Sequence, residues 1–264
     1  MKSPGKEIRL RRILQEDDRT VIIPLDHGLE AGPIAGFEVA EKTLRTVIEG
    51  GADAILTSYG IANRFPELFG QVGLILRVDG GVSSHAPTWE GVGQMHTVED
   101  AVRLGADAVV VNGFLGGPHE TESLTRVGRI AGVCVAWQMP LVVEMFMGSG
   151  VEPTVENVAM AARIGAELGA DLVKTYFVGG TQGYKAVTDH SFAPIVILGG
   201  EKTDHEWAAL QWAREAIDAG AAGTCIGRNV WQHRNAKGMV LALWAIVHED
   251  ASFEEAVEIV KGTG

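Results

Sequence analysis

The sequence predicts an α/β protein folded as a (β/α)₈ barrel, and the evidence is a repeated pattern of short apolar runs. Four runs directly follow Gly-Ala-Asp or a close variant of it, within residues 50–58, 104–113, 168–176 and 219–228. Four other runs lie at residues 20–26, 73–80, 139–146 and 193–200. The runs are rich in β-branched residues and lack strict alternation, which is typical of parallel strands buried on both faces. Eight such strands in 264 residues fit the barrel, and a doubly wound open sheet is the competing architecture.

Helices are expected between these strands. Residues 37–51 and 155–169 show amphipathic helical patterns. The glycine of each Gly-Ala-Asp repeat is expected to end a helix, because glycine tolerates the left-handed φ found at helix C-termini. No Pro-rich or Ser-rich linker and no shift in composition interrupts the chain, so we expect a single domain over residues 1–264.

The first 19 residues precede the first strand and are expected to form a helical extension. Four apolar residues in this extension could share one face of a helix: Ile8, Leu10, Ile13 and Leu14. We expect this helix to close the bottom of the barrel or to join a subunit contact. The arginines around the apolar face also leave open a membrane surface or an acidic partner.

Composition disfavours several classes of function. The chain has 34 Asp and Glu against 22 Lys and Arg, a formal net charge of −12, which argues against nonspecific nucleic-acid binding. Its two cysteines cannot form a disulfide scaffold or a four-thiolate zinc site, and its histidines lack metal-ligand spacing, so no metal is expected. Without a signal-peptide core or a long apolar run, the chain is expected to be cytoplasmic and not associated with a membrane.

The most informative polar residue is Lys174, because it lies inside the apolar run Asp-Leu-Val-Lys-Thr-Tyr, where an amine is costly to bury. Strand alternation places Leu172, Lys174 and Tyr176 on one face, which we expect to be the barrel interior. A desolvated lysine has a lowered pKa and can form a Schiff base with a carbonyl substrate. The alternative is a structural lysine that extends to the barrel rim or pairs with a carboxylate.

Other polar residues end the apolar runs, where the active site of such a barrel forms. Asp26 is followed by His27, and its carboxylate could act as an acid or base, pair with Lys174, or only cap a turn. Two segments after the last two strands predict a phosphate site formed by Gly199, Gly200, Gly227 and Arg228. The alternative is that these glycines only make tight turns.

The segment 80–97 is long for a connection between a strand and the next helix. It could form a lid over the site, and a structural flap or a subunit contact is an equal alternative.

Together these residues carry a resemblance to the archaeal-type class I fructose-bisphosphate aldolases, over nearly the whole chain. That family also holds aminodideoxyheptulosonate synthase, to which IRLRRIL and TVIIPLDHG are especially similar. LGADLVKTYF resembles the segment with the family's Schiff-base lysine, which falls on Lys174, and the acid/base aspartate falls on Asp26. APIVILGGEKT and GAAGTCIGRNVWQ resemble the two phosphate-binding segments. The resemblance implies a TIM barrel, a phosphorylated small-molecule substrate, no cofactor and a homo-oligomer.

One position departs from the family pattern. These aldolases usually carry a proton-transferring tyrosine near the end of the fifth strand, and the matching segment PLVVEMFMGSG has Phe146 there. We expect Glu144, on the same interior face, to take over the proton transfer, alone or together with Tyr176. A buried carboxyl has a raised pKa and can act as an acid or base near neutrality. The alternative is an ion pair of Glu144 with Lys174 or Arg77 that only positions the lysine.

The leading hypothesis is a Schiff-base aldolase that cleaves or forms a C–C bond in a phosphorylated ketose, such as fructose 1,6-bisphosphate or a related sugar phosphate. Lys174 would form the iminium, Asp26 would move protons in the carbinolamine steps, and His27 and Phe146 would line the pocket. The same lysine could instead serve an aldolase-like thiolase that transfers an acetyl group to coenzyme A, or a transaldolase-type synthase. A non-catalytic barrel that binds a sugar phosphate is the alternative outside enzymes.

Overall fold

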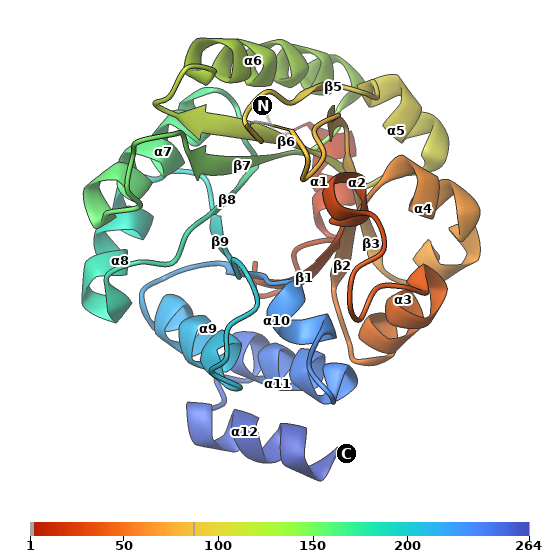
Figure 1. Ribbon diagram of the computed structural model, residues 1–264, viewed down its shortest axis with the longest axis vertical. Coiled ribbons are helices and arrows are strands. Elements are labelled where there is room, and N and C mark those ends of the chain that lie inside the picture. Colours follow the sequence, from red (N-terminus) through yellow and green to blue (C-terminus); the bar gives the residue numbers. More distant parts are fainter. Residues whose placement is uncertain (1–2, 87, 264) are drawn as a thin grey trace.

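The computed structural model describes residues 3–86 and 88–263, and its centre is a closed barrel of parallel strands ringed by helices (Figure 1). Neighbouring strands follow the order β1-β10-β9-β8-β7-β6-β3-β2. Their bounds are β1 Thr20–Leu25, β2 Ala54–Thr57, β3 Gly73–Arg77, β6 Ala108–Leu115, β7 Leu141–Met147, β8 Leu172–Thr175, β9 Ile195–Leu198 and β10 Gly223–Cys225. Each strand falls on one of the eight apolar runs, with β6 and β7 extending past the ends of theirs by two residues and one residue, so the predicted barrel is confirmed and the open sheet is excluded.

Helices surround the barrel or lie at its two ends (Figure 1). They are α1 Pro4–Leu10, α2 Gly28–Ala31, α3 Ala40–Glu49, α4 Tyr59–Arg64, the 3₁₀ helix η1 Pro66–Phe69, α5 Val98–Leu104, α6 Glu120–Trp137, α7 Val155–Glu167, α8 Gly180–His190, α9 Ala208–Asp218, α10 Arg228–Trp231, α11 Ala236–His248 and α12 Phe253–Gly262. The two helices predicted from amphipathic patterns are α3 and α7. Within the described residues, no helix has both the length and the apolar character needed to cross a membrane.

The Gly-Ala-Asp repeats connect helices to the strands that follow them. The glycines have φ angles of +80° to +103°, as expected for a left-handed helix end, at Gly51, Gly105, Gly169 and Gly220. The aspartates of three repeats accept hydrogen bonds of 2.6–2.9 Å from backbone N–H groups at the starts of neighbouring strands, in the pairs Asp53–Val21, Asp107–Leu74 and Asp171–Leu141. The repeat therefore ties each new strand to its neighbour at the bottom of the barrel.

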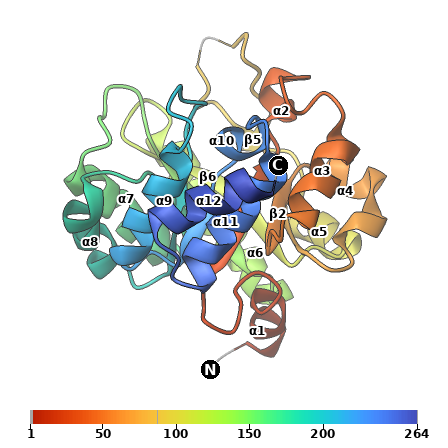
Figure 2. The same ribbon diagram turned by 90° about the horizontal axis from the view of Figure 1, so that it is seen from below.

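The N-terminal extension closes the bottom of the barrel, but its helix does not make the closing contact. Figure 2 shows α1 at the end of the barrel opposite to α2 and α10. The helix itself buries no residue, and Ile8 is 70% exposed. Ile13, which follows the helix, is 1% exposed and belongs to the cluster of apolar side chains inside the barrel. The four apolar residues therefore do not share one buried helical face, because the helix ends before Ile13.

The segment 80–97 lies at the opposite end, the C-terminal mouth of the barrel. Its base is a two-stranded antiparallel pair, β4 Asp79–Gly80 and β5 Gly93–Gln94. Near its tip, the Ser84 N–H donates to the Glu30 carbonyl of α2 at 2.9 Å. On the other side, the buried Glu90 carboxylate accepts from the Ser149 N–H at 2.8 Å. The segment is thus held on both sides of the mouth.

Candidate active site

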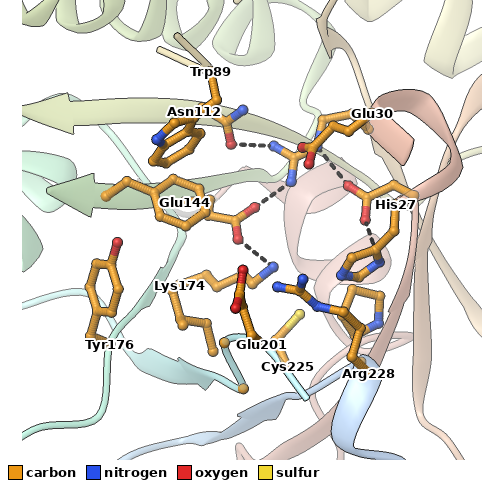
Figure 3. Close-up of a pocket in the computed structure, with 18 residues that line it drawn as sticks. His27, Glu30, Trp89, Asn112, Glu144, Lys174, Tyr176, Glu201, Cys225 and Arg228 are labelled. Atoms are coloured by element: carbon orange, nitrogen blue, oxygen red, sulfur yellow. Dashed lines mark hydrogen bonds and ion pairs between the residues drawn. The ribbon is translucent and has the colours of Figure 1, made fainter. Parts of the chain in front are cut away.

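A cavity of about 410 Å³ opens at the C-terminal ends of the strands (Figure 3). It brings together the residues that the sequence singled out, although they come from strands distributed around the barrel. All of them line it: Asp26, His27, Glu144, Phe146, Lys174, Tyr176, Gly199, Gly200, Gly227 and Arg228. Figure 3 shows Lys174 between Glu144 on one side and Arg228 and Glu201 on the other.

Lys174 and Glu144 form a buried ion pair in this cavity. The parallel register of β7 and β8 places their Cα atoms directly opposite each other. Both side chains face the interior, and Lys174 is 5% and Glu144 4% exposed. The Lys174 Nζ lies 2.5 Å from the Glu144 Oε1. The pairing with a carboxylate that the sequence left as an alternative is therefore present, and it puts a proton acceptor in contact with the amine.

Arg77, at the end of β3, joins the carboxylates of the cavity. Its Nε donates to Asp26 Oδ2 at 2.9 Å, and its Nη2 donates to Glu144. Its Nη1 reaches the Asn112 side-chain oxygen at 2.7 Å and Asp79 Oδ1 at 3.3 Å. Each guanidinium nitrogen is thus engaged by the protein. Arg77 organises the carboxylates and does not offer a free charge to a ligand.

These contacts shift the pKa values of Lys174 and Glu144 in the directions opposite to those expected from burial. Burial alone would lower the pKa of Lys174, but Glu144 and Asp26 outweigh it, and this pKa is raised above its ordinary value. Burial alone would raise the pKa of Glu144, but Lys174 and Arg77 outweigh it, and this pKa is lowered. The expected lowered pKa of the lysine and raised pKa of the carboxyl are both wrong, because each group lies against charges of opposite sign. The resting pair is an ammonium and a carboxylate.

Asp26 and His27 follow β1 and face the same cavity. Burial alone would raise the pKa of Asp26, but Arg77 and His27 outweigh it, so the carboxylate is held ionised. Burial lowers the pKa of His27, whose Nδ1 lies 3.7 Å from Asp26 Oδ1. The His27 ring packs edge-on against Trp231 with the ring centroids 5.5 Å apart. A neutral imidazole and a second carboxylate therefore lie on the β1 side of the cavity.

The segments after β9 and β10 provide unused hydrogen-bond donors. In the described part of the chain, the backbone N–H groups of Gly200, Glu201, Gly227 and Arg228 donate to no protein group. The Arg228 side chain lines the cavity, meets no carboxylate of the described residues, and has a buried Nε without a partner. A guanidinium beside several free N–H groups is an arrangement that binds oxyanions.

Asn229 links these two segments, and sequence analysis missed it. The residue is buried, and its Nδ2 donates to the Gly199 carbonyl at 2.9 Å and to the Glu201 carbonyl at 2.8 Å. Its Oδ1 accepts from the Thr203 N–H at 3.0 Å. Its place directly after Gly227-Arg228 was a signal, since a buried amide there can satisfy the polar backbone of an adjacent loop.

Aromatic side chains form another wall of the cavity. Trp89 packs edge-on against Phe146 and Phe114, with ring centroids 4.7 Å and 4.8 Å apart. Tyr176 packs edge-on against Phe146 at 6.0 Å, and burial raises the pKa of its hydroxyl. Phe146 has no exchangeable proton, so Tyr176 supplies the hydroxyl on this side.

Three lining residues outside the barrel strands were not identified from the sequence: Glu30 of α2, Trp89 of the segment 80–97, and Glu201 after β9. All lie in connecting segments, where the course of the chain could not be inferred from periodicity. Cys225 also lines the cavity, and burial raises the pKa of its thiol to about 12, so the thiol is neutral. Among the described residues, no three His, Cys, Asp or Glu side chains group as metal ligands do.

Similar proteins share both sequence and fold with this chain. A synthase of 2-amino-3,7-dideoxy-D-threo-hept-6-ulosonate from Halobacterium salinarum is 39% identical over 97% of each chain. The 2-amino-4,5-dihydroxy-6-oxo-7-(phosphonooxy)heptanoate synthase of Streptomyces griseus is 31% identical over 94% of this chain and 92% of its own. An archaeal fructose-1,6-bisphosphate aldolase structure, with its catalytic lysine covalently bound to the carbinolamine intermediate, is 31% identical, with a TM-score of 0.82 over 92% of this chain and 99% of its own.

The barrel and these similarities define the protein as a lyase of the aldolase class with a TIM-barrel fold. A family model, the DeoC/LacD family aldolases, matches residues 20–233. The chain belongs to this family of class I aldolases.

Proposed function

We propose that the protein forms or breaks a C–C bond between a phosphorylated ketone and an aldehyde, through a Schiff base on Lys174. The observation that carries this proposal is the buried Lys174–Glu144 pair, with Nζ and Oε1 2.5 Å apart, in a cavity that is also lined by Arg228 and by loops with unpaired backbone N–H groups. Binding alone would not need a buried amine at the cavity centre, because burying an amine is costly.

The Schiff base forms without an added cofactor. The Lys174 ammonium gives a proton to Glu144, and the free amine attacks the ketone carbon, whose oxygen then takes up that proton. The carbinolamine loses water, and the product is an iminium with one N–H. The three hydrogens of the ammonium thus end as two on water and one on the iminium, so the charge is conserved. Asp26, ionised beside Arg77, moves protons in these steps.

The iminium then draws electrons from the neighbouring carbon. A base removes a proton from that carbon, and the resulting enamine attacks the aldehyde carbon while the aldehyde oxygen takes a proton. Glu144 lies against the lysine and Tyr176 lies beside Phe146, so these two groups are the candidates for this proton transfer. Hydrolysis of the new iminium releases the product and the lysine, and the reverse sequence cleaves the bond.

The charges of the cavity support a substrate with one phosphate. Lys174 and Arg77 are held by carboxylates, which leaves Arg228 as the cation beside the free N–H groups. The product named for the Streptomyces griseus relative also carries one phosphate, next to an oxo group. A three-carbon phosphorylated ketone and a four-carbon aldehyde would give such a product. For this chain we propose reactants of this kind rather than fructose 1,6-bisphosphate, whose second phosphate would need a second free cation.

The test is reduction with borohydride in the presence of dihydroxyacetone phosphate, followed by mass spectrometry of the intact protein and its peptides. We expect a stable adduct on Lys174 and none in Lys174→Met. Lys185→Met is the control, since Lys185 is an exposed lysine of α8 paired with Asp189. Absence of an adduct with dihydroxyacetone phosphate and with every other phosphorylated ketone tried would overturn the proposal.

A further inference from the structure

Arg126 of α6, a helix on the outside of the barrel, makes buried polar contacts that lead toward the active site (Figure 1). Arg126 is buried and does not line the cavity described above. Its Nη1 donates to the Val92 carbonyl at 2.6 Å, and its Nη2 donates to the Asn112 carbonyl at 3.3 Å. The same Nη2 lies 3.6 Å from Asp79 Oδ2. One guanidinium therefore contacts a barrel strand and both ends of the β4–β5 pair at the base of the segment 80–97.

Asp79 lies between Arg126 and the active site. It is fully buried, and its Oδ2 accepts from the Asn112 N–H at 2.7 Å. Its Oδ1 accepts from Arg77 Nη1 at 3.3 Å. Arg77 in turn donates to Glu144, the carboxylate that pairs with the lysine. Asp79 thus joins two guanidiniums, one on α6 and one against the carboxylate of the catalytic pair.

The contact with Val92 fixes the segment 80–97 at the mouth of the barrel. Val92 directly precedes β5, and Trp89 lies three residues earlier in the same segment. Trp89 packs edge-on against Phe146 in the cavity wall, with the ring centroids 4.7 Å apart. Arg126 therefore holds the part of the segment that carries an aromatic wall of the active site.

We propose that Arg126 is a positioning residue for the Schiff-base reaction, because it fixes the segment 80–97 and also balances the charge of Asp79. Among the described residues, Asp79 has two cationic partners, Arg126 and Arg77. Without Arg126, Asp79 would compete with Glu144 for Arg77, and one negative charge near the catalytic pair would be left uncompensated. The inference rests on the proposed function, since its main readout is the Schiff base.

An uncompensated negative charge raises the pKa of neighbouring groups, so the loss of Arg126 should raise the pH at which the Lys174 amine becomes reactive. Burial raises the pKa of Asp79, but Arg77 and the Asn112 N–H oppose this rise and still stabilise the carboxylate when Arg126 is absent. The substitution leaves unchanged the ionisable side chains that face the lysine and its carboxylate from the cavity walls: the carboxylates Asp26, Glu30 and Glu201, the cations Arg77 and Arg228, and His27, Tyr176 and Cys225.

The test measures the rate of borohydride trapping of dihydroxyacetone phosphate against pH. In Arg126→Met the curve should move to higher pH by about 0.5–1 unit, so that trapping at pH 8 is about 3- to 10-fold slower. Arg126→Lys keeps the charge and should stay within about twofold of the wild type. Adding Asp79→Asn to Arg126→Met removes the unbalanced carboxylate, so the curve should return toward its wild-type position. Arg129→Met is the matched control, since Arg129 is an exposed arginine of the same helix.

Amide hydrogen exchange of residues 88–97 measures the anchoring on the same samples. We expect faster exchange in Arg126→Met than in the wild type and in Arg129→Met, because the bond to the Val92 carbonyl is lost. A role in packing alone would change this exchange but would not displace the pH curve. If Arg126→Met does not fold, Asp79→Asn alone replaces it, and the curve should then move to lower pH.

Two outcomes overturn the inference while the proposed function stands. One is trapping in the wild type with a pH curve that neither Arg126→Met nor Asp79→Asn displaces. The other is a displacement in Arg126→Met that Asp79→Asn does not reverse, because the charge would then not act through Asp79. Absence of trapping in the wild type would overturn the proposed function, and this inference with it.

Discussion

Glu144 and Lys174 are direct partners in the register of β7 and β8, and their charged ends meet inside the barrel at 2.5 Å. Strand pairing alone therefore brings the carboxylate to the amine. Arg77 contacts the other Glu144 oxygen, so the carboxylate bridges two cations. Glu144 is the carboxylate in direct contact with the amine, so this pair is the first point at which to test the proton transfer.

Replacing Glu144 by glutamine should separate the formation of the Schiff base from turnover. Glu144 raises the pKa of Lys174, so its removal lowers that pKa, and borohydride trapping should reach half its maximum at a lower pH than in the wild type. Turnover should fall by about 100-fold or more, the usual contribution of a general acid or base. The measurements are pH profiles of trapping and of kcat. Near-normal turnover in Glu144→Gln, with none in Lys174→Ala, would show that Glu144 only positions the lysine.

The replacement of Arg228 by methionine should weaken binding of the phosphorylated reactant. A hydrogen bond to a charged group contributes about 1.5–3 kcal/mol, so KM for dihydroxyacetone phosphate should rise by about 10- to 100-fold. KM for dihydroxyacetone, which lacks the phosphate, should stay near its wild-type value. Arg234→Met is the control, because Arg234 is 80% exposed and contacts Glu206 away from the cavity. An equal loss with both ketones would contradict a phosphate role for Arg228.

The Gly-Ala-Asp repeats show how much of the fold could be predicted from the sequence. Their apolar runs located the strands, because burial on both faces demands such residues and a left-handed helix end demands glycine. The candidate residues also converge on one cavity, since the ends of parallel strands meet at one end of a barrel.

The pKa directions of Lys174 and Glu144 could not be predicted in the same way. They depend on the pairing of Lys174 with Glu144 and, for Glu144, also on Arg77, which is 67 positions away in the sequence. Burial was correctly inferred for both groups, but the strand register that places the two charges against each other could not be read from either apolar run. The position of Ile13 was predicted wrongly for a similar reason. Helical periodicity placed Ile13 on the apolar face of the N-terminal helix, but α1 ends at Leu10 and Ile13 packs inside the barrel.

Loss of the Asn229 side chain should affect both stability and binding. Asn229→Ala leaves the carbonyls of Gly199 and Glu201 without this partner, and a buried unsatisfied group costs about 1–3 kcal/mol. We expect the free energy of unfolding to fall by that amount in urea titrations, with KM for dihydroxyacetone phosphate raised as well. Asn157→Ala, at the exposed start of α7, should leave KM unchanged. If the Asn229 variant keeps a normal KM, Asn229 does not organise the oxyanion site.

The last prediction concerns pH and the bottom of the barrel, where His248 of α11 bridges two aspartates. Its Nδ1 lies 2.9 Å from Asp17 and its Nε2 lies 3.0 Å from Asp53. Burial alone would lower the pKa of His248, but the hydrogen bonds with Asp53 and Asp17 outweigh it, so this pKa is raised. A raised pKa in the folded state means that the protonated histidine stabilises the fold below its unfolded pKa of about 6.5 and that this stabilisation is lost as the pH rises through the folded value.

The variant His248→Gln should therefore lower the free energy of unfolding more at pH 6 than at pH 9. We expect a difference of about 1 kcal/mol, because the pair with Asp17 is partly exposed and screened by solvent. Urea titrations of both proteins at the two pH values measure it. His190→Gln is the control, since His190 lies at the exposed end of α8 and its substitution should cost little at either pH. A larger loss of unfolding free energy at pH 9 than at pH 6 would mean that His248 contributes as a neutral packing residue. A protonated histidine would instead stabilise the fold more at pH 6.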